Sequence, residues 1–142
     1  MQDDRLYSAS GDMTIKVWDV IELIEIFTLK GHTSGVQSLA VGGSMLYSGS
    51  VSGEIKVWDI ESLLETATLT GHKRCVHSLT LGNRLYSSSA SGESVIKIWD
   101  VNKLVEVGSV KGNKGDIWAL VLHGNMLISA SGLRNKVVKI WI

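Results

Sequence analysis

The chain has 142 residues, of which 44% are hydrophobic and 20% charged, so it has the length of one domain and the composition of a core-forming chain. Fourteen basic and fourteen acidic side chains cancel, which argues against a general binder of nucleic acid or of anionic membrane surfaces. No apolar run approaches the ~18–20 residues of a membrane-spanning helix. Cys75 is the only cysteine, which excludes an intrachain disulfide and favours a reducing compartment, the cytoplasm with the nucleus as the alternative.

The tryptophans recur with a period of about 40 residues, which indicates an internal repeat. Trp18, Trp58, Trp99 and Trp141 are separated by 40, 41 and 42 residues, and each ends a run such as Ile55-Lys56-Val57-Trp58. Two other runs recur upstream, at 6–10, 46–50, 85–89 and 127–131, and at 36–41, 76–81 and 117–122. The dipeptide Gly31-His32 returns as Gly71-His72.

Each full period contains four short runs with β-branched or alternating residues, bounded by Gly, Ser, Asn or Asp. In chain order we expect strands at 6–10, 14–19 and 24–29, then at 36–41, 46–50, 54–59 and 65–69. The third unit repeats this set of four, and the fourth offers 117–122, 127–131 and 137–142. The pattern predicts an all-β chain of small antiparallel sheets, each too small to be stable alone.

On these runs the chain resembles the WD-repeat β-propellers over residues 1–142. The resemblance implies blades of four antiparallel strands, named a to d from the hub outwards. About 3.5 blades are present, in units that end near Asp19, Asp59, Asp100 and Ile142. Strand a is missing from the first unit and strand d from the last, so we expect an open arc that needs remaining propeller blades or a second copy for closure. The residue sequence of the repeats resembles in particular that of the propellers of zinc-finger or RING ubiquitin ligases and α-type kinases.

The resemblance also implies that the recurring His, Ser, Asp and Trp residues form a structural hydrogen-bond network in each blade, not a catalytic triad. We expect Trp58 to pair with His32 and Ser48, and Trp99 with His72 and Ser87. Trp18 and Trp141 take the same structural place in the outer units. The turn aspartate is present as Asp12 in the first unit, but its position holds Ser52, Glu93 and Asn135 in the others. We therefore expect that no unit carries all four members.

Two other kinds of site are disfavoured. His72, Cys75 and His77 are close in sequence, but no further ligand for a metal is recognisable, and His72 already has a structural place. The glycine pairs fall in turns between strands a and b and do not form a phosphate-binding loop. We predict a protein with no catalytic residues, no metal and no cofactor, and thus not an enzyme.

The resemblance implies that partners dock on the end of the propeller formed by the d–a and b–c loops. The residues expected to contact a partner there are Gln37, Lys73, Arg74, His77, Asp116, Trp118 and Arg134. The loops at this end carry more basic than acidic residues, whereas the c–d connections are mainly acidic. We predict a protein-interaction scaffold whose partner is a protein or peptide, acidic or phosphorylated. The alternative is the substrate-recognition part of a larger enzyme such as a ubiquitin ligase or a protein kinase.

Overall fold

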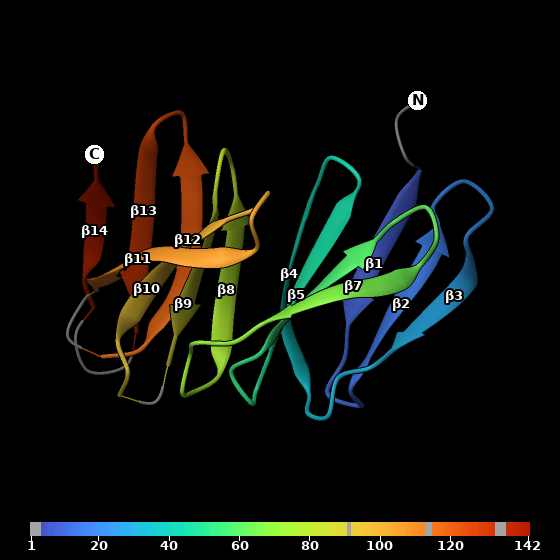
Figure 1. The fold of residues 1–142 in the computed structure, drawn as a ribbon, viewed down its shortest axis with the longest axis horizontal. Helices are drawn as coiled ribbons and strands as arrows, with labels where there is room; N and C mark the ends of the chain where they lie inside the picture. The colour runs from blue at the N-terminus through green and yellow to red at the C-terminus, as the bar shows by residue number, and fades with distance from the viewer. Residues whose placement is uncertain (1–3, 91, 113–114, 133–135) are drawn as a thin grey trace.

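The computed structural model describes residues 4–90, 92–112, 115–132 and 136–142. Over these residues the chain forms fourteen β-strands and no helix, so no helix is present there that could cross a membrane. The strands lie in four antiparallel sheets placed one after another (Figure 1). The all-β propeller class predicted from the repeats is confirmed, and the row of sheets is not closed into a ring.

We call the four sheets blades 1 to 4 in chain order. Blade 1 contains β1 (Arg5–Ala9), β2 (Thr14–Asp19) and β3 (Ile24–Lys30). Blade 2 contains β4 (Val36–Gly42), β5 (Met45–Ser50), β6 (Ile55–Asp59) and β7 (Leu64–Leu69). Blade 3 contains β8 (Val76–Leu81), β9 (Leu85–Ser89), β10 (Val95–Asp100) and β11 (Val105–Lys111). Blade 4 contains β12 (Ile117–His123), β13 (Met126–Ser131) and β14 (Val138–Trp141).

Within each blade, strands that follow one another in the sequence pair with one another. Blades 2 and 3 have the full order a to d, blade 1 has strands b to d, and blade 4 has strands a to c. The first strands of blades 2, 3 and 4 (β4, β8 and β12) lie along the hub, where β8 contacts β4 on one side and β12 on the other. In blade 1 this inner place has no strand of the described chain, and β1 is the inner edge.

The core lies between the blades, because blades 2 and 3 bury both of their faces against their neighbours and blades 1 and 4 bury one face each. One cluster joins Ile15 and Val17 of blade 1 to Leu46 and Trp58 of blade 2. The opposite face of blade 2 packs Ile55, Val57 and their neighbours against blade 3, and Ile96 joins blade 3 to blade 4 in the same way. Burial on both sides explains why strand c is a nearly continuous hydrophobic run.

The aspartate that follows each of the first three repeat tryptophans closes the tight connection between strands c and d. Asp59 Oδ1 accepts the backbone N–H groups of Glu61 and Ser62, at 3.1 and 2.7 Å, and Asp19 and Asp100 accept the equivalent groups in blades 1 and 3. These bonds lower the pKa of all three carboxyl groups. The same turns place Leu23, Leu63 and Leu104 at φ of 57°, 58° and 56°, a left-handed conformation that costs energy for a residue with a Cβ.

Candidate functional site

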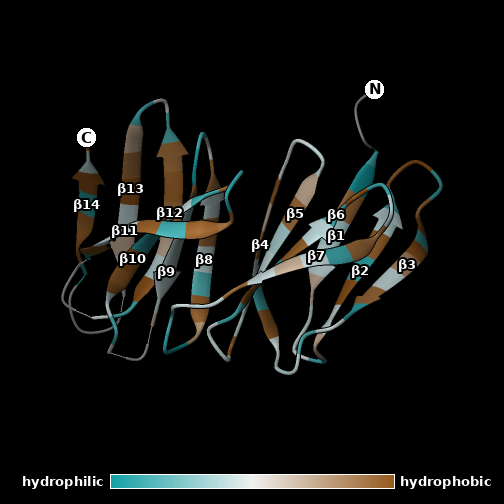
Figure 2. Cartoon of the chain, viewed as in Figure 1, coloured by the Kyte–Doolittle hydropathy of each residue, from teal (hydrophilic) through white to brown (hydrophobic). Residues whose placement is uncertain are grey.

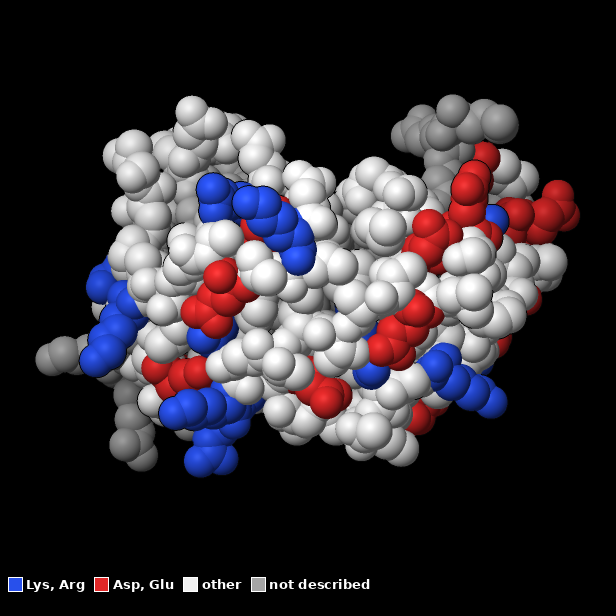
Figure 3. All heavy atoms as spheres, in the orientation of Figure 1, with Lys and Arg blue, Asp and Glu red and all other residues white. Residues whose placement is uncertain are grey.

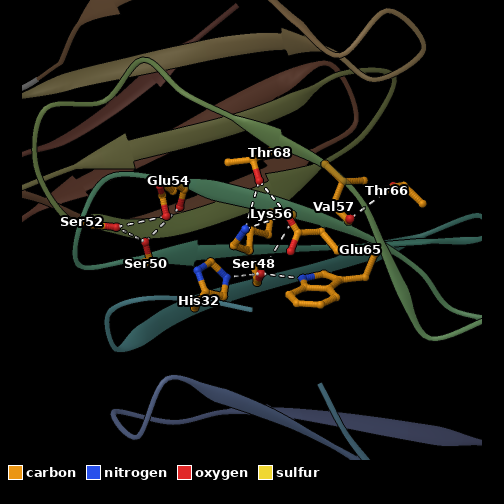
Figure 4. Close-up of polar contacts among 11 residues, drawn as sticks. His32, Ser48, Ser50, Ser52, Glu54, Lys56, Val57, Glu65, Thr66 and Thr68 are labelled. Carbon is orange, nitrogen blue, oxygen red and sulfur yellow. Dashed lines mark hydrogen bonds and ion pairs between the residues drawn. The ribbon is translucent and has the colours of Figure 1, made fainter. Parts of the chain in front are cut away.

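Blade 2 contains a buried chain of hydrogen bonds centred on the hydroxyl of Ser48 (Figure 4). The indole Nε1 of Trp58 donates to Ser48 Oγ at 2.8 Å, and His32 Nε2 lies 2.7 Å from the same oxygen. Ser48 is fully buried, and His32 and Trp58 are nearly so. Gly31 allows this arrangement, because a Cβ there would lie 3.0 Å from the Trp58 ring and 2.8 Å from Glu65.

Blade 3 repeats this chain and extends it by one member. Trp99 Nε1 donates to Ser87 Oγ at 2.8 Å, and His72 Nε2 lies 2.7 Å from Ser87 Oγ. The other ring nitrogen, His72 Nδ1, lies 3.2 Å from Glu93 Oε2, and the Glu93 carboxylate also accepts the backbone N–H of Lys73. This unit lacks the turn aspartate, as expected, but the longer side chain of Glu93 takes its place in the network.

Glu93 also fixes the direction of the hydrogen bonds in blade 3. A carboxylate accepts the proton of His72 Nδ1, so Nε2 is the acceptor of the ring and the Ser87 hydroxyl donates to it. In blade 2, Ser52 stands at the corresponding position and its hydroxyl bonds to Ser50 and Glu54 instead. Nδ1 of His32 is buried and has no hydrogen-bond partner among the described residues.

Among the described residues, the outer blades show the first bond of this chain alone. Trp18 Nε1 donates to Ser8 Oγ at 2.8 Å, and Trp141 Nε1 donates to Ser129 Oγ at 2.9 Å. Asp12 caps its own turn by accepting the backbone N–H and the hydroxyl of Thr14. Asn135, which holds the Asp position in blade 4, lies outside the described residues.

These networks hold the blades together and offer no nucleophile to a substrate. Ser48 and Ser87 are fully buried between Trp and His side chains. Burial lowers the pKa of His32 and of His72 below the ordinary value, and for His72 the charge of Glu93 offsets part of that effect. For Glu93, burial raises the pKa, but its hydrogen bonds outweigh burial and leave the pKa lowered. Both histidines are therefore neutral at pH 7 and serve as hydrogen-bond links.

The predicted docking residues on strands a lie on neighbouring blades at the hub. His77 of β8 stacks on Trp118 of β12, with ring centroids 4.5 Å apart and an interplanar angle of 23°. Trp118 is 46% exposed, and its indole lies 3.0 Å from where a Cβ at Gly132 would be, so a side chain there would displace it. Gln37 is exposed on β4. Two of the three strand-a positions thus form one aromatic surface.

The remaining docking candidates differ in their freedom to contact a partner. Lys73 and Arg74 are exposed in the loop before β8, and neither side chain forms an ion pair with the described residues. Asp116 accepts the backbone N–H of Gly92 at 3.3 Å and so holds the b–c turn of blade 3. Arg134 lies outside the described residues.

The two ends of the blades carry different charges. In Figure 3, basic side chains lie at the lower left, the end where the d–a and b–c loops lie in Figure 1, and in a second group above the centre; acidic side chains gather at the upper right over blade 1. At the loop end, Asp12, Glu93 and Asp116 are already engaged in hydrogen bonds within the protein. The unpaired charges available to a partner there are therefore mainly positive.

Metal-ligating side chains do not gather in the described part of the chain. No group of three or more His, Cys, Asp or Glu residues is found there that could hold a metal ion. His72 is engaged with Ser87 and Glu93, and His77 with Trp118. Burial raises the pKa of Cys75, which disfavours its thiolate form.

The repeats of this chain match a known family along most of its length. The WD domain, G-beta repeat, matches residues 2–19, 24–59 and 64–100. The chain belongs to the WD40 repeat family. WD40 propeller domains generally serve as protein-interaction scaffolds and are typically non-catalytic. No curated protein matches the chain.

Solved structures resemble this chain over nearly its whole length. The computationally designed protein Ika4 is 27% identical with a TM-score of 0.86, and the match covers 99% of this chain and 86% of Ika4. The WD40 repeats of RRP9 are 29% identical with a TM-score of 0.89, over 98% of this chain and 44% of RRP9. A chain of the mitotic checkpoint complex is 25% identical with a TM-score of 0.88, over 97% of this chain and 44% of that one. The chain therefore spans less than half the length of the latter two structures.

Sequence reasoning missed three features of the site. The first is Glu93, which was expected to leave the position of the turn aspartate unfilled. Its carboxylate accepts the same hydrogen bond, because its side chain is one methylene longer than that of aspartate. The stack of His77 on Trp118 joins residues 41 positions apart, and the equal repeat spacing of their strands was the available signal. The third is the set of c–d turn caps by Asp19, Asp59 and Asp100, for which the aspartate after the first three repeat tryptophans was the signal.

Proposed function

We propose that this WD40 protein is a non-catalytic scaffold that holds an acidic or phosphorylated peptide on the end formed by its d–a and b–c loops. The observation that carries the proposal is the exposed stack of His77 on Trp118, with the unpaired cations Lys73 and Arg74 in the loop that leads into the strand of His77. Tryptophan and arginine are the residue types that most often dominate protein interfaces.

The two parts of this surface have complementary roles. Lys73 and Arg74 supply positive charge for carboxylates or a phosphoryl group, and arginine binds such groups with two parallel hydrogen bonds. The indole of Trp118 is held by stacking on His77, so little side-chain entropy is lost when a peptide packs on it. Neighbours of this fold occur in assemblies with other proteins, as the mitotic checkpoint complex illustrates.

The test is a screen of an acidic and phosphorylated peptide library against the purified protein, followed by calorimetry on the peptides that bind. We expect the double variant Lys73→Glu/Arg74→Glu to weaken binding at least tenfold and Trp118→Ala to weaken it by a similar factor. The matched control is Lys103→Glu, which reverses an exposed cation in the c–d turn of the same blade. If Lys103→Glu weakens binding as much, or if neither docking variant does, the proposed surface is wrong.

A further inference from the structure

Blade 4, the last in the row, has an exposed hydrophobic face, whereas the equivalent faces of blades 1 to 3 are buried against the next blade. We call Val121, Ile128, Val138 and Ile140 the blade-4 face; Figure 2 shows hydrophobic colours along β13 and β14 at this end. Val138 occupies the position of strand c that Ile15, Ile55 and Ile96 hold in the other blades, as its pairing with Ala130 of strand b shows. Val138 is 66% exposed, whereas the other three side chains are fully buried. Ile140 is 59% exposed, whereas Val57 at the same position is 1% exposed.

Blade 1 has the opposite open face. We call Leu6, Trp18, Val20 and Leu23 the blade-1 face. Leu6 is 55% exposed, whereas Leu46 and Leu85 at the same position of strand b are fully buried. Leu23 is 82% exposed, whereas its counterparts Leu63 and Leu104 are partly buried against the preceding blade. The two end faces have the same residue types as the inner blades. Their side chains are exposed because no neighbouring blade of the described chain packs on them.

The two faces are the two halves of one interface that the chain forms three times internally. Between blades 1 and 2, strand c residues equivalent to those of the blade-4 face (Ile15 and Val17) pack on residues equivalent to those of the blade-1 face (Leu46, Trp58 and Leu63). The same pairing joins blade 2 to blade 3 and blade 3 to blade 4. The surface complementary to the blade-4 face is therefore present on this same polypeptide.

We propose that two copies of this chain associate head to tail, the blade-4 face of each on the blade-1 face of the other, and close a ring of eight blades. A head-to-tail contact closes into a ring when the rotation between neighbours completes a full turn. Because the formal net charge of the chain is zero, two copies do not repel each other at long range. The crystallised designed protein Ika4 has the same fold, and the match covers 99% of this chain and 86% of Ika4.

The area favours the closed ring over an open pair. From the strand spacing and rise, one junction between three-stranded faces buries about 500 Å², which is less than stable interfaces bury. A ring of two copies has two junctions and buries about 1,000 Å², near the lower limit of specific interfaces. Only the closed form gains both junctions, since the second contact is made within the complex.

The missing inner strand of blade 1 makes each junction smaller than the internal interfaces. An open groove of about 260 Å³ lies beside β1, lined by Leu6, Tyr7, Leu39 and Ala40 together with Arg5 and Val41. The groove lies next to the position that strand a occupies in the other blades. We therefore expect the ring to dissociate on dilution, while each copy keeps its four blades.

The experiment measures the molar mass of the protein by light scattering after size exclusion, over a hundredfold range of concentration. We expect twice the chain mass of 15.4 kDa at high concentration. Val138→Lys and Leu6→Lys each place a charge on one of the two faces, and each is expected to reduce the mass to that of one chain. The control is Leu64→Lys on the outer strand β7 of blade 2, where Leu64 is 65% exposed, and this variant is expected to keep the doubled mass.

Circular dichroism on the same fractions shows that each variant keeps its strands. A mass of one chain at every concentration would overturn the proposal, and so would a mass that grows without limit, which indicates an open filament. If Val138→Lys dissociates the pair and Leu6→Lys does not, the contact joins two blade-4 faces and the ring is wrong. An equal loss in Leu64→Lys would show that the association does not use the end faces.

Discussion

Blades 2 and 3 contain the same buried Trp–Ser–His chain, and they differ in what holds the far side of the histidine. In blade 3, His72 Nδ1 is bound by Glu93, which also accepts the backbone N–H of Lys73. In blade 2, His32 Nδ1 is buried without a partner among the described residues, and Ser52 occupies the place of the carboxylate. The comparison separates the part of the network that orients tryptophan from the part that ties the b–c turn to the preceding loop.

The largest effects are expected from removing the shared hydroxyl. Ser48→Ala and Ser87→Ala each leave a buried indole N–H and a buried imidazole Nε2 without a partner, which costs about 2–4 kcal/mol of unfolding free energy. Ser8→Ala and Ser129→Ala remove only the bond to tryptophan, in less buried surroundings, and are expected to cost about 1 kcal/mol. Urea unfolding at pH 7 measures all four. Equal losses would mean that the histidine bond contributes nothing.

The next effect concerns the carboxylate of blade 3. Glu93→Ala makes blade 3 resemble blade 2 and removes bonds to His72 and to the Lys73 backbone, so we expect a loss of about 1–2 kcal/mol. Glu106→Ala on the same blade is the control, because it removes the partly exposed ion pair with Lys97, for which less than about 1 kcal/mol is typical. The urea midpoints of the two variants test the difference. A loss in Glu93→Ala no greater than in the control would assign Glu93 no structural role.

The smallest effect is the converse change in blade 2. Ser52→Glu supplies an acceptor for His32 Nδ1 and is expected to stabilise the protein by about 1 kcal/mol. Ser52→Gln, which has the same length and no charge, is expected to gain less, because bonds to charged acceptors are stronger. A thermal melt of both variants beside the parent protein is the measurement. If Ser52→Glu is no more stable than the parent, the partnerless nitrogen of His32 costs nothing.

The pH dependence provides a second readout for the same variant. Because the pKa of His32 is lowered in the folded protein, the unfolded chain binds more protons below about pH 6.5. Stability that is present above this pH is therefore lost as the pH falls. The carboxylate in Ser52→Glu raises the pKa of His32 again, so the variant is expected to lose less stability between pH 7 and 5.5 than the parent protein loses.

The architecture was predictable from the sequence because it depends on local signals that recur. Each expected strand that is described begins and ends within one residue of the observed strand, for example 46–50 against Met45–Ser50 and 65–69 against Leu64–Leu69. The tryptophan spacing fixes the unit, and alternation of side chains fixes the faces. Counting strands also gives the two open faces, since the described residues supply no strand a to blade 1 and no strand d to blade 4.

The finer features of the site depend on distances that a pattern of residue types does not contain. Glu93 reaches His72 through one extra methylene, and whether that reach suffices depends on the path of the turn backbone. Trp118 contacts His77 because neighbouring blades bring two strands a together at the hub. Asp116 has the chemistry of a partner contact but is engaged with the turn of blade 3.

The pairing of strands only with their sequence neighbours has a consequence for how the molecule loses its structure. In an array of this kind each blade is supported by the blades beside it, and stability is a sum of blade and neighbour contributions. Blades 2 and 3 have two neighbours, whereas β14 and β1 belong to blades with one. Amide hydrogen exchange would therefore follow a gradient, with fraying at both ends and the slowest amides in β6 and β9.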